Sequence, residues 1–371
     1  MMLEPTGSLY RRPAAHSLSA APSREEKAMK KLLLGLAIVG AFTSVAQAQT
    51  SVTVYGILDA GLTRETGSAR GNVVKLATGV QSGNRLGFKG VEDLGGGLKA
   101  NFQVESGFDL DTGALRQGGT LFGRQSWVGL SGNFGAVALG RQYNPIFVAL
   151  DAIDPFSTGL TGATTNLMNP GSVRTNNAIT YYSPVMAGFG ANFLYGLGEV
   201  AGDPARARTY GVSLGYTIGG LTLAAAYDNA NDGSATTPVT NTTKLSLIGG
   251  TYKFGPATLH LAYEREKDDA GTDFRDAMVG VSAAAGAGGT VLASFIDKRD
   301  KSSAGDRNAR QYAIGYLYAM SKRSNLYTSY SRIRNKDNAA FTVGDASSGG
   351  SADQVPGATS SGFTIGIRHV F

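Results

Sequence analysis

The stretch that decides the fold runs from Gly95 to Glu105 and reads Gly-Gly-Gly-Leu-Lys-Ala-Asn-Phe-Gln-Val-Glu. Its glycines suit a tight turn, and after them apolar residues alternate with Lys, Asn, Gln and Glu. Successive side chains of a β-strand point to opposite faces of the sheet. The alternation therefore predicts an amphipathic strand that leaves a turn at 95–97. A soluble β-sandwich and a membrane β-barrel both contain such strands, so this stretch alone leaves both open.

The connections between similar segments favour the barrel. Gly-rich or small-residue turns alternate along the chain with long segments rich in Asp, Asn, Ser, Thr and Gly. Bacterial outer-membrane barrels have short periplasmic turns and long external loops, whereas a sandwich has no reason to sort its connections in this way. We expect about 16 antiparallel strands, which enclose a channel rather than a packed core. The expected short turns are 95–97, 132–135, 219–220, 255–256, 286–289 and 321–324, and the expected long loops are 64–80, 110–120, 145–172, 229–243, 267–273, 300–308 and 336–359.

Composition argues against several function classes. The 371 residues include no Cys and three His, which disfavours thiol catalysis, disulfides and a multi-His metal site. The net charge of +6 falls to +3 once residues 1–48 are set aside, because they hold six of the 34 basic and three of the 28 acidic residues. No dense run of Lys and Arg remains, so a nucleic-acid partner is not expected. We expect no cofactor, no metal and no enzymatic activity.

The N-terminal region carries an export signal. Residues 29–48 begin with Met and a Lys pair, continue as an 11-residue apolar run and end on Ala-Gln-Ala. This order is typical of a secretory signal peptide, and the apolar run is too short to span a bilayer. Cleavage after Ala48 would leave a mature barrel of residues 49–371. Residues 1–28 lack periodicity, and we expect them to be an over-extension of the gene model, with the true start at Met29.

Aromatic residues cluster near the ends of the expected strands. Amphipathic rings suit the headgroup level of a bilayer. The last expected strand, 362–371, alternates in polarity and ends on Phe371, as a final barrel strand would. The aromatic residues expected at the lipid boundary are Tyr181, Tyr182, Tyr312, Tyr316, Tyr318, Tyr327 and Tyr330.

The sequence resembles the general porins of Gram-negative bacteria, in particular the β-proteobacterial group of outer-membrane trimeric porins. The matching stretches span the mature chain in order: 51–61, 84–95, 121–131, 134–145, 176–184 and 366–371. The resemblance implies an all-β transmembrane barrel of 16 strands, a homotrimer in the outer membrane and passive diffusion of ions and small hydrophilic solutes. It also implies that the third external loop folds into the lumen as a constriction. The longest loop expected from the sequence, about 145–172, fits that role. Outer-membrane lipid and lipopolysaccharide are expected partners.

Candidate pore residues follow from charge and strand parity, because a channel selects by its bore and by the field across its narrowest point. Arg85 and Lys89 alternate with apolar neighbours and should face water. By resemblance, Arg85, Arg124 and Arg174 match the basic cluster of the family's constriction. Arg141 is a further candidate whose parity disagrees, so that either a bulge intervenes or the residue sits at the rim. The acidic counterparts expected on the inward loop are Asp151 and Asp154.

One alternative for the arginines stays open. Each arginine could instead be a wall residue that pairs with a carboxylate and holds the loop in place. Asp59 and Glu105 should face the lumen as solvated wall residues.

The leading functional reading is a general diffusion channel with weak anion preference. A substrate-specific channel would show an aromatic ladder in its lumen, and Tyr55 and Tyr182 point inward without forming an obvious series. A non-conducting barrel used for adhesion would need a passenger domain, and the sequence contains no segment that looks like one.

Overall fold

The computed structural model of the chain describes residues 51–371 except 235, 240, 351 and 352. The chain divides into two units, 1–48 and 49–371, and only the second contains described residues. The interpretations of 1–28 and of the signal peptide at 29–48, with its cleavage after Ala48, lie outside the described residues. Within the described part, no helix is long and apolar enough to cross a membrane.

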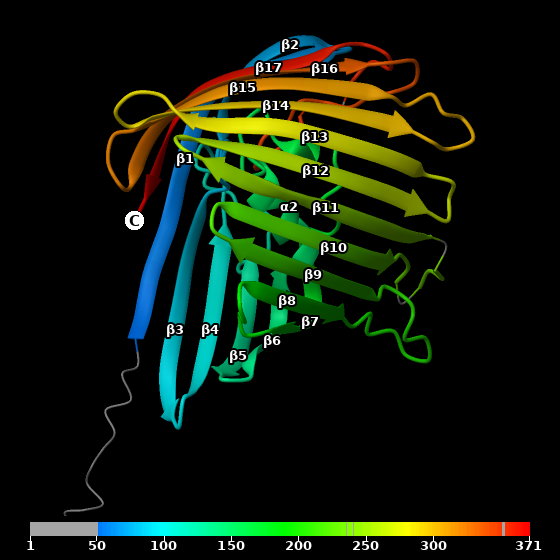
Figure 1. Cartoon of the computed structure of the whole chain (residues 1–371). Coiled ribbons are helices and arrows are strands. Elements are labelled where there is room, and N and C mark those ends of the chain that lie inside the picture. The colour runs from blue at the N-terminus through cyan, green and yellow to red at the C-terminus, as the bar shows by residue number, and fades with distance from the viewer. Residues whose placement is uncertain (1–50, 235, 240, 351–352) are drawn as a thin grey trace, which may run out of the picture. The chain divides into compact units, whose positions relative to one another are not determined.

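The second unit is one antiparallel sheet that closes on itself (Figure 1). Pairing runs mainly between strands adjacent in the chain, and the last strand returns to the first over Ile57–Thr66 of β1. The sheet is therefore the antiparallel barrel that the connections predicted. Its strands are β1 (Ser51–Ser68), β2 (Gly71–Thr78), β3 (Arg85–Gly95), β4 (Leu98–Gly107), β5 (Gln125–Gly132), β6 (Gly135–Tyr143), β7 (Arg174–Tyr182), β8 (Phe189–Gly196), β9 (Thr209–Ile218), β10 (Leu221–Asn231), β11 (Thr242–Phe254), β12 (Ala257–Asp268), β13 (Asp273–Ala284), β14 (Gly289–Asp300), β15 (Ala309–Ala319), β16 (Ser324–Asn335) and β17 (Ser360–Val370).

The 17 strand segments in the described residues form 16 barrel strands. Both β2 and β3 pair with β1, β3 with its first half and β2 with its second, so they are two parts of one barrel strand. Residues 79–84 interrupt that strand. The count of about 16 strands is thereby confirmed.

The long loop predicted at 64–80 is wrong. There β1 continues to Ser68 and β2 begins at Gly71, so only a tight turn separates them. The polar residues that suggested a loop include Glu65 and Lys75, whose charged atoms lie 2.6 Å apart. Polar composition here reflects a cross-strand ion pair in the barrel wall rather than a solvated connection.

The six predicted short turns all lie between consecutive strands. At the first of them, Gly95, Gly96 and Gly97 have φ of +85°, +61° and +83°, a region that residues with a Cβ rarely adopt. The sequence did not reveal two further connections, a short one at 183–188 and a long one at 197–208.

The polarity of the wall is inverted relative to a soluble protein. On β17, Phe363, Ile365 and Ile367 are about half exposed, whereas Thr364 between them is fully buried. On β13, Val279 is 44% exposed and Asp276 is 0% exposed. An apolar outer face over a polar interior is the pattern of a barrel immersed in lipid.

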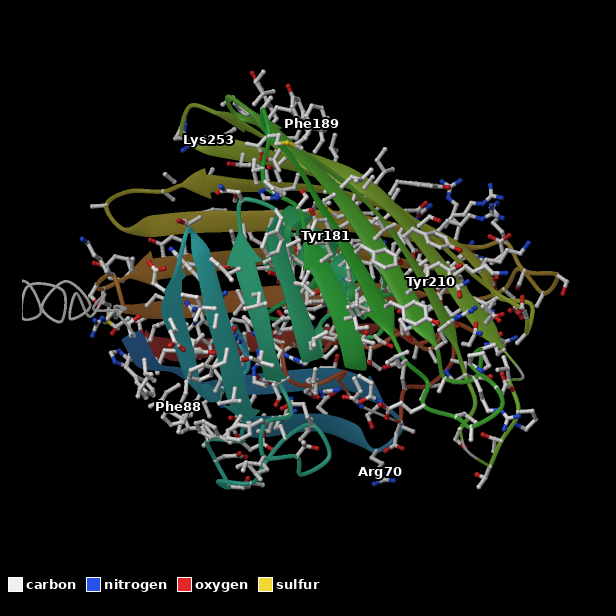
Figure 2. The ribbon with its side chains drawn as sticks, turned by 90° about the horizontal axis from the view of Figure 1, so that it is seen from below. Arg70, Phe88, Tyr181, Phe189, Tyr210 and Lys253 are labelled. Carbon is white, nitrogen blue, oxygen red and sulfur yellow. The ribbon has the colours of Figure 1, made fainter. Side chains whose placement is uncertain are left out.

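Most of the aromatic residues predicted at the lipid boundary occupy the outer face. Phe88 and Phe189 lie at the periphery of the barrel (Figure 2). Tyr181, Tyr312, Tyr316, Tyr318 and Tyr330 are exposed as predicted. Tyr182 shares the parity of the buried Thr180, and its hydroxyl lies 3.5 Å from the buried Gln142 on β6, so it lies on the inner face and its assignment to the lipid boundary is wrong. The prediction for Tyr327 is wrong: its ring is 2% exposed, and its hydroxyl donates to Asp59 Oδ1 at 2.6 Å.

The segment 144–172 between β6 and β7 forms a short helix and packs on the inner side of the wall. Helix α2 (Pro145–Ile153) has Asn144 as its N-cap and a proline in its first turn, a favourable start for a helix. Its apolar residues Ile146, Leu150 and Ile153 join one buried cluster with wall residues of β11, β13, β14 and β16. A 3-10 helix, η1 (Thr164–Asn166), follows. Burial of these apolar side chains fixes the position of the segment.

Candidate functional site

Three of the predicted arginines converge on one cavity. Arg85 and Arg174 are the first residues of β3 and β7, and Arg124 immediately precedes β5. All three line a cavity of about 480 Å³. Arg85 pairs with Ile57 near the middle of β1, because β2 continues the same barrel strand beyond residues 79–84. The cavity therefore lies part-way along the barrel.

Glu105 and Tyr143 hold the arginines in place. The Nε atom of Arg124 lies 2.6 Å from Glu105 Oε1, and Nη1 of Arg85 lies 4.0 Å from the same oxygen. The Tyr143 hydroxyl accepts from Nη2 of Arg124 at 2.6 Å and from Nη2 of Arg174 at 2.8 Å. The Arg174 guanidinium also lies over the Tyr143 ring, 4.5 Å from its centroid. One carboxylate and one phenol therefore orient three like charges.

Two glycines make room for Arg124. A Cβ on Gly107 would lie 3.1 Å from the Arg124 side chain, and a Cβ on Gly83 would lie 2.9 Å from its Nη1. Both distances are shorter than ordinary contacts, so a larger residue at either position would displace the guanidinium. The register of β4 against β5 brings Glu105 close to Arg124, because Glu105 pairs directly with Gln125, the residue after Arg124.

Asp151 faces this cluster across the cavity. It lies on α2 and lines the same cavity as the arginines. Its Oδ1 accepts a hydrogen bond of 2.5 Å from the Thr158 hydroxyl, which fixes the carboxylate on the loop. Phe147, one helical turn earlier, stacks on Tyr143 at 5.3 Å and joins the loop to the arginine side.

The second predicted acid, Asp154, does not line the cavity. It is 3% exposed, and its carboxylate accepts from the backbone N–H groups of Phe156, Thr158 and Thr164 and from the Thr164 hydroxyl. Burial raises the pKa of Asp154 to about 6, against the lowering effect of these hydrogen bonds. Asp154 therefore organises the turn after α2. Its carboxylate contacts groups of the loop and does not face the cavity.

Lys89 and Arg141 lie apart from the three arginines. Lys89 is four residues further along β3 than Arg85, roughly 13 Å at the rise of a strand, and its Nζ lies 5.3 Å from the centre of the Tyr55 ring. The register of β6 against β7 shifts between Gly140 and Gln142, so the bulge foreseen as one option is present. Arg141 does not line the cavity, and its Nε donates to the Gly123 carbonyl at 2.7 Å.

Two acids expected to be solvated are buried, so that interpretation is wrong. Glu105 is 2% exposed because Arg124 and Tyr55 cover its oxygens, the Tyr55 hydroxyl donating at 2.9 Å. Asp59 is 0% exposed and accepts from the N–H groups of Gln81 and Ser82 at 2.7 and 2.6 Å. Strand parity correctly predicted that Glu105 and Asp59 point inward. It could not predict the neighbouring side chains that exclude water from them.

Sequence reasoning missed several residues of the cavity. Arg116, Arg368 and Asp345 line it together with the three predicted arginines. Arg368 lies beside Asp59 only because β17 pairs with β1, which brings the two ends of the barrel sequence together. Its inward parity on the last strand was the one available signal. Asp345 and Arg116 come from long connections, for which the sequence carries no comparable signal.

Polar contacts on the opposite side fix the far end of the loop. Lys298 Nζ donates to the Leu167 carbonyl and lies 2.8 Å from Asp276 Oδ2. Glu264 accepts from the Asn169 N–H at 2.7 Å, and His260 Nδ1 lies 2.7 Å from the Ile153 carbonyl oxygen. Segment 144–172 is therefore held to β12, β13 and β14 as well as to the arginine side.

Metal chemistry finds no support in the residues that the structure describes. Among residues 51–371, leaving out the four undescribed positions, no group of three or more His, Asp or Glu is arranged to hold a metal ion.

A closed barrel with an apolar exterior and a charged interior defines a membrane channel protein. The sequence profile described as Gram-negative porin matches residues 35–338. The chain is 36% identical to an outer membrane porin protein of Delftia acidovorans and 33% identical to one of Bordetella pertussis, in each case over 92% of this chain and the whole length of the relative. The chain therefore belongs to the Gram-negative porin family.

Solved structures agree with this assignment. The anion-selective porin from Comamonas acidovorans has a TM-score of 0.76 and 33% sequence identity, covering 87% of this chain and all of that one. The OmpT protein of Vibrio cholerae, solved in a trimer form, has a TM-score of 0.66 over 87% of this chain and 99% of its own, but at 16% identity it supports the fold alone. The protein is an outer-membrane porin that lets ions and small hydrophilic solutes cross by passive diffusion.

Proposed function

We propose that this porin is a general diffusion channel with a weak preference for anions. Five arginines and two aspartates line the cavity beside segment 144–172, and this excess of cations is the observation that carries the proposal. A positive field at the narrowest part of a pore concentrates anions and opposes cations. The related porin from Comamonas acidovorans is described as anion-selective, which points in the same direction.

We propose that the loop at about 145–172 is the constriction, with Arg85, Arg124 and Arg174 as its basic wall and Asp151 as its acidic side. The contacts of Asp151 and Phe147 with the cavity support this arrangement. Lys89 and Arg141 would act elsewhere along the pore, and Asp154 would act by shaping the loop.

The test is the reversal potential in a salt gradient across a planar bilayer. The variant R85Q/R174Q removes two charges that make no ion pair closer than 4.0 Å in the described residues. It should shift the reversal potential toward cation selectivity. K322Q/R323Q removes two exposed charges in the short turn between β15 and β16 and is the charge-matched control. An unchanged reversal potential in R85Q/R174Q would refute the assignment of these arginines.

A substrate-specific channel is the second candidate. Tyr143 and Phe147 stack beside the arginines and could bind a flat anionic solute. A conductance that saturates, or that one class of solute blocks at low concentration, would favour this function. A conductance linear in salt concentration favours general diffusion.

Assembly and processing complete the proposal. We propose a homotrimer in contact with outer-membrane lipid and lipopolysaccharide, as the trimer form of OmpT suggests, and stepwise channel closure in threes would support it. Passive diffusion would be the whole activity, without an enzymatic group or cofactor.

The signal peptide at 29–48 would be cleaved after Ala48. N-terminal mass spectrometry of the mature protein tests this cleavage site, and the same measurement on the precursor tests the start at Met29.

A further inference from the structure

Residues 79–84 leave the plane of the wall between β2 and β3. The facing strand β1 pairs with β3 as far as Ile57 and with β2 from Ala60 onward, so only positions 58 and 59 face this segment. The surplus residues are expelled from the sheet, as at a large β-bulge. Val80 is 0% exposed and lies in one buried cluster with Leu160. The segment 79–84, called here the wall protrusion, therefore points into the barrel and packs on the inward loop.

The carboxylate of Asp59 on β1 anchors the wall protrusion. Its Oδ2 atom accepts hydrogen bonds from the backbone N–H groups of Gln81 and Ser82 at 2.7 and 2.6 Å. Its Oδ1 atom accepts from the hydroxyl of Tyr327 on β16 at 2.6 Å, which fixes the orientation of the carboxylate. Asp59 is 0% exposed, so no water is at hand to replace a lost donor or acceptor.

The main chain of Asp59 adds two contacts with the same segment. Its N–H donates to Asn84 Oδ1 at 2.6 Å, and its carbonyl accepts from the Gly79 N–H at 2.7 Å. Arg368 on β17 pairs with Asp59 in the register, but no ion pair joins the two side chains in the described part of the chain. The Asp59 carboxylate therefore acts as an acceptor for the wall protrusion rather than as half of a wall ion pair.

Two long connections that line the cavity are hydrogen-bonded to the wall protrusion at a single atom. The Val80 carbonyl accepts from the Leu160 N–H of segment 144–172 at 2.7 Å. The same oxygen accepts from the Ala346 N–H of connection 336–359 at 3.2 Å. A displacement of the wall protrusion would therefore move both connections.

The wall protrusion also contacts the inward loop and the arginine cluster closely. A Cβ on Gly159 would lie 2.1 Å from the Gln81 carbonyl oxygen, so the loop rests directly on this backbone. At the other end of the wall protrusion, the Gly83 carbonyl accepts from Arg85 Nε at 3.0 Å. One short segment thus supports the loop and the first of the cavity arginines.

We propose that Asp59 is a positioning residue of the pore: its hydrogen bonds hold the wall protrusion and, through Val80, fix how far segment 144–172 and connection 336–359 reach into the passage. The proposal rests on the constriction proposed for 145–172. Hydrogen bonds from backbone N–H groups to an ionised carboxylate are strong, and burial strengthens them further. Asp59 itself does not meet the solute and acts only through the segments that it holds.

The experiment records single channels of the refolded mature protein in planar bilayers and measures its hydrogen–deuterium exchange in detergent. D59A removes the acceptor of the Gln81 and Ser82 N–H groups. The occupancy of higher-conductance substates and the exchange rate of peptides covering 79–84 and 157–162 should each rise at least ~10-fold, the factor that corresponds to the loss of one hydrogen bond to a charged group. D59N should behave like the wild type, because its amide oxygen can accept from both N–H groups and its Nδ2 can donate to the Tyr327 oxygen.

The variant G159A tests the same contact from the loop and leaves the wall intact, so it decides the outcome if D59A does not fold. The added Cβ would push the loop away from the Gln81 carbonyl and should also produce higher-conductance substates. D59A/G159A should show no further increase, because both substitutions break one contact. A wild-type channel record in G159A would overturn the proposal.

The matched control is T63V. Thr63 lies on the same inward face of β1, is 1% exposed and loses one buried hydrogen bond of 2.9 Å with Thr364. It should match the wild type in both measurements. Unchanged exchange in D59A, or an equal effect in T63V or D59N, would refute the role of Asp59. Faster exchange in D59A with wild-type conductance would instead contradict the constriction at 145–172 on which the proposal rests.

Discussion

The barrel holds two groups of three arginines, and their surroundings differ in kind. Arg85, Arg124 and Arg174 lie inside, where Glu105 and Tyr143 orient them and little water reaches the ion pair. On the outer face, Arg299 of β14 and Arg310 of β15 are 62% and 59% exposed and share one acid, Asp297, while Arg334 of β16 is exposed and forms no ion pair among the described residues. A buried ion pair has no solvent to replace a lost partner, whereas an exposed pair does. The same side chain is thus a fixed part of the pore wall on the inner face and an exposed group on the outer face.

The largest effect should come from breaking the inner pair. The substitution E105A leaves the Arg124 guanidinium, on a residue only 6% exposed, without its carboxylate. We expect a loss of about 3–5 kcal/mol in the free energy of unfolding, the usual range when one partner of a buried pair is removed. Denaturant unfolding in detergent micelles measures it. A loss below about 1 kcal/mol would mean that water reaches the inner cluster and that the contrast between the groups is false.

The second prediction concerns the loop that faces the inner cluster. L150A removes a fully buried side chain from the contact of α2 with the wall. We expect a cost of about 2–5 kcal/mol and a larger, noisier single-channel conductance, because the segment would no longer be fixed. V148A, on an exposed position of the same helix, is the matched control. Identical conductance in L150A and the wild type would argue against a constriction formed by this loop.

The third prediction uses pH to change the charge of the inner cavity. Burial raises the pKa of Asp345 to about 6, although the N–H groups of Ser347 and Ser348 donate to its carboxylate and lower the pKa. Above pH 6 the residue is an anion, and below pH 6 it takes up a proton and becomes neutral. Acidification from pH 7.5 to 5 should therefore increase anion preference, seen as a shift of the reversal potential. D345N should show the high preference at both pH values. The prediction fails if D345N retains the pH dependence of the wild type.

The smallest effect should come from the outer pair. D297A removes a carboxylate that is 15% exposed from two guanidinium groups that are each more than half exposed. Exposed pairs contribute about 0–1 kcal/mol, so stability should change by less than about 1 kcal/mol. Comparison with E105A under the same unfolding conditions isolates the effect of burial on one kind of pair.

The wall was predictable because its pattern is local. Alternation at 98–105 and the glycines at 95–97 specify a strand and its turn without reference to the rest of the chain. The same pattern failed where polar residues face inward as partners, as at Glu65 and Lys75, because a paired polar residue and a solvated one look alike in a sequence.

The cavity was predictable only in part. Parity and resemblance pointed to Arg85, Arg124 and Arg174, and the structure brings these three together. The burial of Glu105 depends on the path of neighbouring strands, and the place of Asp154 depends on how the loop folds on itself. The contributions of Arg368 and Asp345 come from segments more than 200 residues away from Arg124 in the chain.

The sequence by itself determined that this chain forms an alternating β-barrel with short turns at one end and long loops at the other. Those properties follow from residue type and spacing, since side-chain direction in a strand has a period of two. Only the tertiary structure decided which charges meet. Closure of β17 on β1 and the packing of α2 against the inner wall join residues remote in sequence, and burial then decides whether each charge is a fixed partner or an exposed group.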